Sequence, residues 1–230
     1  MGNYRIDQLV LGDIATNCWI VAYPPEGKTD PAGASAKDGA VCAVIDPADQ
    51  VKLIIAHLNR HGLRPEHILL THGHFDHLAA LPDLAGAYPE ALIAIHREDA
   101  HYLGGRALEV HRESFSAAGG SAAYVDSLWK AMPAPSRLLE DGEQVGPFTV
   151  LSLPGHTPGS AGFYLPGEKV LFSGDTLFRG DCGRVDLPGG DQGKIEQSLK
   201  RLLGMDGGIR VLPGHGPATT IAEERGTRYF

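Results

Sequence analysis

The residues 71–77, T-H-G-H-F-D-H, constrain this chain more than any other stretch. Four of them carry side chains that bind metals: His72, His74, Asp76 and His77. A single tetrahedral centre would not easily take four ligands from so short a turn, because each ligand must approach from a different corner. Two adjacent centres can share them. A solvated loop with incidental histidines is the alternative, but three imidazoles and a carboxylate within six residues favour a metal site.

The flanking residues predict where this cluster lies in a fold. The short apolar run 68–71 predicts a buried strand, and the residues from Leu78 onward predict the start of a helix. The cluster therefore follows the C-terminal end of a strand, which is where open α/β folds bind their ligands.

Other predicted strands end in the same way. Each stops at a turn that contains Gly or Pro and carries a His or Asp side chain. Besides the strand before His72, these strands end at His156, Asp175 and His215. Four such endings indicate that the strand ends converge on one site, where glycines let the backbone turn sharply and approach the ions.

The remaining pattern predicts two similar halves in a single domain of residues 1–230, with a flexible surface loop at about 24–40. The other six histidines are not assigned to the site, and His67 only bounds the strand before the cluster. His57 and His61 on a predicted helix and His96 at a strand end are expected in solvent, and His101 and His111 are given no role. The expected elements are a hairpin in 4–23, strands at 41–45, 92–95, 148–153, 163–165, 170–172 and 209–212, and helices from 49, at about 78–86, within 97–131 and around 195–203.

Composition excludes several classes of function. The net charge of −8 argues against nucleic acid or an anionic membrane as partner. The three cysteines form no C-x-x-C pair, and no apolar run or N-terminal signal pattern indicates membrane insertion or export. We therefore expect a cytoplasmic protein that acts on a small-molecule substrate, and the oligomeric state stays open.

Four motifs carry a resemblance to a known family. H-x-H-x-D-H at 72–77, P-G-H-T-P-G-S at 154–160, S-G-D-T-L-F at 173–178 and P-G-H-G at 213–216 resemble, in order and spacing, the metallo-β-lactamase superfamily. Most members of this superfamily are binuclear hydrolases. The resemblance implies an α/β fold, the αβ/βα four-layer sandwich, with two mixed sheets face to face and helices on the outer faces. The site would lie at one edge, between the halves.

The resemblance also implies a set of ligands. His72, His74 and His156 would hold one ion, Asp76, His77 and His215 would hold the second, and Asp175 would bridge the two. We expect two divalent ions, zinc first, although iron and manganese also suit these side chains. Asp76 and Asp175 are the candidate catalytic residues, because their charges and a hydroxide leave roughly one positive charge on the site, suited to an anionic transition state. Candidates for orienting the imidazoles are Asp46, Thr71, Thr157 and Ser160, each with a local turn or cap role as the alternative.

The loop 178–186, F-R-G-D-C-G-R-V-D, is similar to that of short bacterial glyoxalase II-like hydrolases. This implies a thioesterase that cleaves hydroxyacyl-thiol substrates by attack of a metal-bridging hydroxide. Persulfide dioxygenases have a similar loop, and in that alternative one iron would be held by His72, His156 and Asp175. The P-G-H-G segment favours the hydrolase. A lactonase or another ester hydrolase is a further alternative, whereas β-lactamases generally lack an aspartate at the position of Asp175.

Substrate residues are the least constrained part of the prediction. Arg179 and Arg184 are candidate contacts for an anionic group, with structural salt bridges as the alternative. Cys182 is a candidate contact or a redox-sensitive thiol. The helical domain that grips glutathione in long glyoxalase II enzymes has no counterpart in the fifteen residues after His215, so we expect weak dependence on the thiol.

Overall fold

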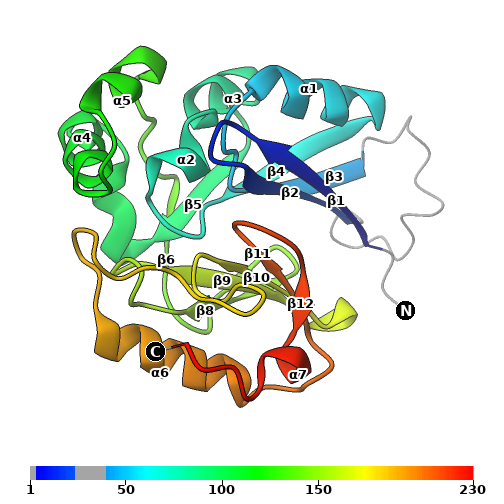
Figure 1. Ribbon diagram of the computed structural model, residues 1–230. Coiled ribbons are helices and arrows are strands. Elements are labelled where there is room, and N and C mark those ends of the chain that lie inside the picture. Colours follow the sequence, from blue (N-terminus) through cyan, green and yellow to red (C-terminus); the bar gives the residue numbers. More distant parts are fainter. Residues whose placement is uncertain (1–3, 24–39, 230) are drawn as a thin grey trace.

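The structure, a computed structural model, describes residues 4–23 and 40–229. Within these residues, two six-stranded sheets lie face to face, and helices cover their outer faces (Figure 1). This is the α/β sandwich that the sequence predicts. The flexible loop expected at about 24–40 lies outside the described residues, except for Ala40, which begins a strand.

The first sheet has the order β1-β2-β3-β4-β5-β6. Strands β1 and β2 form the expected hairpin, β2 also pairs with β3 antiparallel, and the other neighbours are parallel. The strands are β1 Arg5–Leu11, β2 Thr16–Tyr23, β3 Ala40–Ile45, β4 Leu63–Leu69, β5 Leu92–His96 and β6 Arg137–Leu139. The strand expected at 68–71 is wrong in its bounds, because the parallel ladder with β3 extends it back to Leu63, through polar residues and Pro65.

The second sheet has the order β12-β11-β10-β9-β8-β7. Its neighbours are antiparallel except for β10 and β11, which run parallel and therefore bring the ends of both strands to the same edge. The strands are β7 Gln144–Val145, β8 Phe148–Ser152, β9 Ala161–Leu165, β10 Val170–Gly174, β11 Arg210–Pro213 and β12 Thr219–Thr220.

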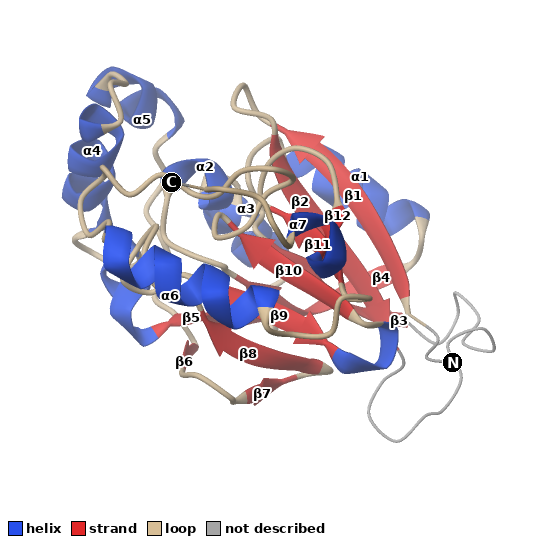
Figure 2. Cartoon of the chain, turned by 60° about the horizontal axis from the view of Figure 1, so that its bottom comes forward, coloured by secondary structure: helices blue, strands red, loops and turns tan. Residues whose placement is uncertain are grey.

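Helices α1 and α3 cover the first sheet and α6 covers the second (Figures 1 and 2). The single helix expected at about 78–86 is wrong: two short helices, α2 and α3, occupy this region, and α3 begins where Pro82 can take an early helical position without losing a hydrogen bond. The helices are α1 Val51–Arg60, α2 Phe75–Leu78, α3 Leu81–Ala87, α4 Ala107–Ala117, α5 Ala122–Leu128, α6 Gln192–Leu203 and α7 Ile221–Glu224, with 3-10 helices η1 Arg97–Tyr102 and η2 Pro166–Glu168.

Strand β2 shows how the layers are held together. All of its residues are buried, and successive side chains point to opposite faces. Cys18, Ile20 and Ala22 pack toward the helices, whereas Trp19, Val21 and Tyr23 pack between the sheets. The inter-sheet layer is completed by aromatic residues of the second sheet, Phe148, Phe163 and Phe172. Burial on both faces fixes the register of β2, because a slip of one residue would exchange the two sets.

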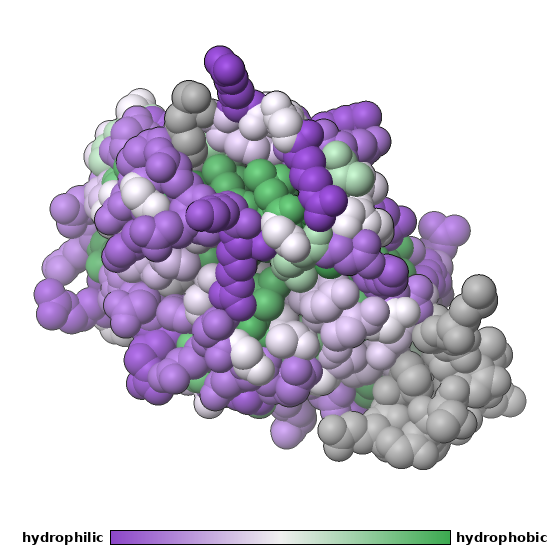
Figure 3. Space-filling view, turned by 90° about the horizontal axis from the view of Figure 1, so that it is seen from below, coloured by the Kyte–Doolittle hydropathy of each residue, from purple (hydrophilic) through white to green (hydrophobic). Residues whose placement is uncertain are grey.

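The outer surface on the side of α6 and α7 is largely hydrophilic, with a hydrophobic strip among the polar side chains (Figure 3). None of the helices in the described residues is sufficiently long and apolar to span a lipid bilayer.

Candidate metal centre

The seven predicted ligands come together at one edge of the sandwich, although they belong to five separate segments. His72 and His74 follow β4, and Asp76 and His77 lie in α2. The others follow strands of the second sheet: His156 after β8, Asp175 after β10 and His215 after β11. Their ligand atoms form overlapping groups within 4.8 Å: His72, His74 and His156; His72, His77 and Asp175; and Asp76, His77 and His215.

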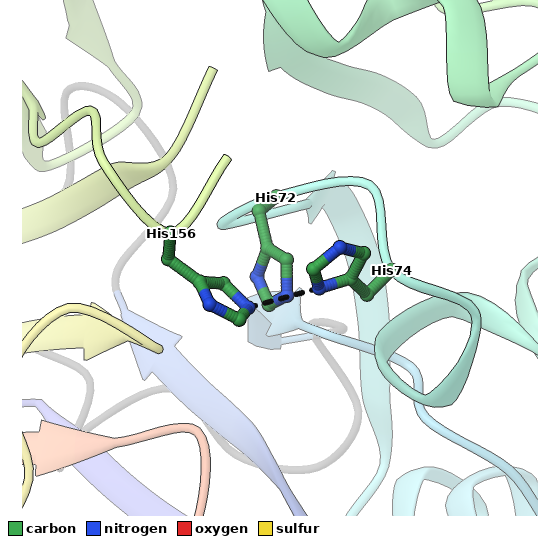
Figure 4. Close-up of side chains that lie close together, drawn as sticks. All are labelled: His72, His74 and His156. Carbon is green, nitrogen blue, oxygen red and sulfur yellow. Dashed lines mark hydrogen bonds between the residues drawn. The ribbon is translucent and has the colours of Figure 1, made fainter. Parts of the chain in front are cut away.

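The first group consists of three buried imidazoles, His72, His74 and His156. Figure 4 shows these side chains pointing toward one another from two loops. Nδ1 of His74 lies 2.9 Å from Nε2 of His156. Three nitrogen donors converging in this way can coordinate one metal ion.

The second group contains Asp76, His77 and His215. Nε2 of His215 lies 3.2 Å from both Nε2 of His77 and Oδ2 of Asp76. Asp76 also accepts a hydrogen bond from Oγ1 of Thr16, at 3.2 Å. The group therefore offers two nitrogens and one carboxylate oxygen to a second ion.

Asp175 lies between the two groups. Its Oδ1 is 3.3 Å from Nε2 of His77, and its Oδ2 is 3.5 Å from Nε2 of His215. The same Oδ2 is 3.7 Å from Nε2 of His156, in the first group. A carboxylate in this position can contribute to both ions at once.

Unpaired polar atoms support the fit of a metal to these residues. His72 Nε2 and Asp175 Oδ1 are buried and have no hydrogen-bond partner. An unpaired buried polar atom costs about 1–3 kcal/mol, and two in one cluster call for a ligand. Divalent cations coordinated by this His and Asp set would remove most of that cost.

Most of the site is in the protonation state that metal binding needs. Burial lowers the pKa of His72 well below its usual value and that of His74 to about 3. Burial opposes charge on His77 and Asp175 too, but their mutual attraction wins, so the pKa of His77 is raised and that of Asp175 is lowered to about 2. Because neutral imidazoles and ionised carboxylates are the forms that bind metals, His72, His74 and Asp175 are ready for an ion, whereas His77 must release a proton when one binds.

Asp46 and Thr71 orient one imidazole from each group. Nδ1 of His72 donates to Oγ1 of Thr71 (3.1 Å), and that hydroxyl donates to Oδ2 of Asp46 (2.7 Å). Nδ1 of His77 donates to the same carboxylate oxygen, at 2.9 Å. These donations leave Nε2 of both rings as the free nitrogen, the arrangement expected of partners that fix a ligand's tautomer.

Thr157 and Ser160 have the local turn role that the sequence left as the alternative. They hydrogen-bond to each other at 2.8 Å and shape the loop 154–160, without a hydrogen bond to an imidazole. Oγ1 of Thr157 donates to Asp99 (2.7 Å), whose carboxylate also accepts the backbone N–H groups of Gly73 (2.9 Å) and Gly159 (2.7 Å). Asp99 therefore ties the loop that carries His72 and His74 to the loop that carries His156.

Sequence reasoning missed Asp99, which is fully buried. Burial raises the pKa of this carboxyl group, although its hydrogen bonds favour the charged form. The signal that could have found it is a fifth strand ending, because Asp99 follows β5 by three residues.

The substrate candidates in the loop 178–186 lie at different distances from the site, and one of the three lines the cavity. Arg184 borders the cavity above the ligands, whereas the exposed Arg179 and the half-buried Cys182 are absent from its lining. Burial raises the pKa of the Cys182 thiol to about 11, so the thiol stays protonated at neutral pH. The guanidinium of Arg184 pairs with Asp186 at 2.7 and 2.8 Å, and its backbone oxygen accepts Nδ1–H of His156 at 2.7 Å. The main chain of Arg184 thus orients a ligand.

The turn before His215 has room only for a glycine, Gly214. A Cβ atom at this position would lie 2.2 Å from Oδ1 of Asp175 and 2.6 Å from Cε1 of His77. No side chain fits there without displacing two ligands. The turn therefore brings the main chain against the metal cluster.

Two of the histidines expected in solvent, His57 and His96, are partly buried, and His111, for which the sequence predicts no role, is buried. His57 pairs with Asp7 at 3.0 Å, and His96 contacts Ser152 and accepts the backbone N–H of Glu98. His111 is buried, and its Nε2–H donates to the backbone oxygen of Tyr102 at 2.9 Å.

A cavity of about 430 Å³ opens above the ligands. Its floor contains five of them, and its walls come from the β1–β2 turn, α4 and the segment 184–187. The floor residues are His74, Asp76, His156, Asp175 and His215; the wall residues are Ile14, Phe75, His111, Ser114, Phe115, Ala118, Gly119, Gly120, Arg184 and Leu187. The ligands are thus accessible to a molecule of moderate size.

Comparison with known proteins gives consistent results. Residues 36–215 match the family described as the metallo-beta-lactamase superfamily. The chain is 34% identical over 193 residues to the probable metallo-hydrolase YqgX of Bacillus subtilis and 32% identical over 189 residues to the hydroxyacylglutathione hydrolase GloC of Haemophilus influenzae. Each alignment covers 82% of this chain and 86% of the relative.

Two solved structures are similar over nearly the whole chain. TTHA1623 in a di-iron-bound form is 36% identical, with a TM-score of 0.77 and coverage of 96% of this chain and 98% of that one. The BLEG-1 B3 metallo-beta-lactamase is 30% identical, with a TM-score of 0.75 and coverage of 96% of both chains.

Proposed function

Since the chain belongs to the metallo-β-lactamase superfamily, and within it resembles metallo-hydrolases, we propose that it is a binuclear metallohydrolase that cleaves thioesters of the hydroxyacyl-thiol type. The observation that carries the two-metal part is the position of Asp175, whose carboxylate lies within 3.7 Å of imidazole nitrogens from both groups.

In this proposal His72, His74 and His156 would hold one divalent ion, and Asp76, His77 and His215 would hold the other. Bound ions would polarise the substrate carbonyl and supply a hydroxide at neutral pH. Zinc, iron and manganese all suit imidazole and carboxylate donors.

The protein's own residues would prepare the site for a carbonyl substrate. The buried carboxylates Asp76 and Asp175 offset part of the metal charge, which leaves a net positive charge for an oxyanion. Asp46 holds the imidazole of His72 through Thr71 and that of His77 by a direct hydrogen bond. Little reorganisation of these rings is therefore needed during the reaction.

Thioesters are the proposed substrates for two reasons. The relative GloC is a hydroxyacylglutathione hydrolase, and this chain matches 86% of its length. The loop 178–186, by which the chain resembles short glyoxalase II-like enzymes, contacts the site through the Arg184 carbonyl on His156. A small-molecule substrate also agrees with the cavity of about 430 Å³.

A mononuclear iron persulfide dioxygenase would need only His72, His156 and Asp175. It would leave Asp76, His77 and His215 without a function, although these three are gathered within 4.8 Å and His77 is held by Asp46. The complete second group therefore favours the hydrolase over the dioxygenase.

Steady-state kinetics of the metal-loaded protein test the proposal. We expect release of free thiol from S-lactoylglutathione and from lactoyl thioesters of other thiols, with a preference for glutathione below about a thousandfold, or about 4 kcal/mol. The β-lactam nitrocefin should be a poor substrate. Efficient β-lactam hydrolysis without thioester hydrolysis would overturn the proposed substrate class.

A further inference from the structure

Three large apolar side chains from outside the metal-binding segments line the cavity above the metal ligands. Ile14 belongs to the β1–β2 turn, Phe115 to α4 and Leu187 to the segment after Asp186. These residues, here named the apolar rim, come from separate parts of the chain. These residues are far apart in the sequence, and the fold brings them together at one cavity.

Ile14 is a large hydrophobic side chain that is exposed to solvent beside the metal ligands. Among the described residues, the large hydrophobic side chains that stand exposed are Val10 (57%), Ile14 (44%) and Leu53 (52%). Of these, Ile14 lines the cavity that contains the metal ligands, and the other two do not. An apolar side chain left in water beside a reactive site gains free energy when an apolar ligand covers it.

Phe115 gives the rim a rigid wall. Its ring stacks on Tyr124, with a centroid distance of 5.1 Å and an angle of 10°. The main chain of Gly120 lies so near that a Cβ there would be 2.3 Å from the ring. A ring packed in this way keeps its orientation, so the wall presents a fixed apolar surface to the cavity.

Charge in the cavity is limited. Apart from the histidines and carboxylates of the site, the charged side chain in the described lining is Arg184. Asp186 accepts hydrogen bonds from one edge of its guanidinium, Nε at 2.7 Å and Nη2 at 2.8 Å, and so offsets its charge. A substrate group that carries a carboxylate would find no unpaired cation in this lining.

We propose that the cavity binds the acyl half of the thioester and that this half, beyond its carbonyl and the adjacent hydroxyl, is an apolar, uncharged chain or ring in contact with the apolar rim. This inference rests on the proposed thioesterase function. A soluble carrier thiol is long and charged, so it extends into solvent, whereas an acyl group of a few carbons fits a cavity of about 430 Å³.

The test measures kcat/KM of the metal-loaded enzyme on lactoyl, butyryl, hexanoyl, benzoyl and succinyl thioesters of one thiol. We expect kcat/KM to rise along the apolar series and to be lowest for the anionic succinyl group. Ile14→Ser and Phe115→Ala should each lower kcat/KM for hexanoyl by about tenfold and change that for lactoyl much less.

Leu53→Ser is the matched control, because it removes an equally exposed apolar side chain outside the cavity, and it should leave the series unchanged. A wild-type preference for the succinyl ester, abolished in Arg184→Ala, would overturn the inference in favour of anion recognition. Equal values across the series would also overturn it.

A protein that cleaves no thioester would refute the proposed function instead. The rim would then be tested by binding to the metal-loaded protein, with benzyl mercaptan and 3-mercaptopropionate as probes. Tighter binding of benzyl mercaptan, weakened in Ile14→Ser, would support the rim. Tighter binding of 3-mercaptopropionate would overturn it.

Discussion

At the scale of single residues, Asp99 has a larger structural role than its position outside the motifs indicates. Its buried carboxylate accepts hydrogen bonds from Gly73, Thr157 and Gly159, and so fixes the loop of His72 and His74 against the loop of His156. An amide at this position would turn one N–H group toward another donor, which leaves buried polar atoms unpaired.

We therefore expect Asp99→Asn to lower the free energy of unfolding by about 2 kcal/mol and to weaken metal binding at the first group. Urea denaturation and titration with a competing chelator measure the two effects. Asp83→Asn is the control, because Asp83 forms an exposed pair with Lys130, and it should change stability by less than about 0.5 kcal/mol. Wild-type chelator resistance in Asp99→Asn would contradict the role.

Asp175 carries the two-metal interpretation. Asp175→Asn removes the shared charge while it nearly preserves the side-chain volume. We expect the variant to lose one metal ion per chain and at least about a hundredfold in kcat, the scale of losing a main charge-stabilising group. Metal analysis and thioester kinetics on the same sample check this. Two retained ions with unchanged kcat would show that Asp175 does not bridge.

At the scale of elements, α4 is attached to η1 through His111. Its Nε2–H donates to the backbone oxygen of Tyr102, and burial lowers the pKa of His111 to about 4, from 6.5 in the unfolded chain. Between these values the unfolded chain binds a proton that the folded chain excludes. The contribution is therefore fully present above pH 6.5 and is lost as the pH falls toward 4.

The loss should reach about 3 kcal/mol on this scale. His111→Gln can keep a donor near the Tyr102 carbonyl and has no such titration, so its stability should fall less steeply between pH 6.5 and 4.5. Urea denaturation of both proteins, matched in metal content, measures this difference in stability. The other histidines titrate in both proteins, so their contributions cancel in the comparison. Parallel pH curves would contradict the assignment.

Elements and site were predictable from sequence to different extents. The convergence of the seven predicted ligand residues could be foreseen because their segments follow strand ends with Gly or Pro, a local signal that a single sequence displays. Asp99 could not, since its partners Gly73 and Gly159 are distant in sequence and meet it only in the fold. The start of β4 could not be predicted for a related reason. Its first residues are mostly polar and show no apolar pattern, but they pair with β3 in the folded sheet.

The anion-binding hypothesis for Arg179, Arg184 and Cys182 shows the same limit. Sequence placed all three in one loop, but the loop turns so that Arg184 reaches the cavity while Cys182 packs against the outer core. Gly183 lies between these two residues, and a Cβ at this position would clash with the backbone oxygen of Asp175. Substrate roles for these residues stay predictions.

At the scale of the whole molecule, the metal centre joins the two halves of the sandwich. One half supplies His72, His74, Asp76 and His77, and the other supplies His156, Asp175 and His215. Metal removal should therefore destabilise the entire fold rather than one loop. At a free metal concentration of 100 times Kd, each site adds about 2.7 kcal/mol, so chelation should lower Tm by several degrees in a scanning calorimeter.

Metal analysis and turnover, measured on one preparation of the wild-type protein, decide whether this chain is a two-metal hydrolase. We expect close to two divalent ions per chain and thioester hydrolysis without oxygen uptake. One iron per chain, no second ion, and oxygen uptake with glutathione persulfide would contradict it.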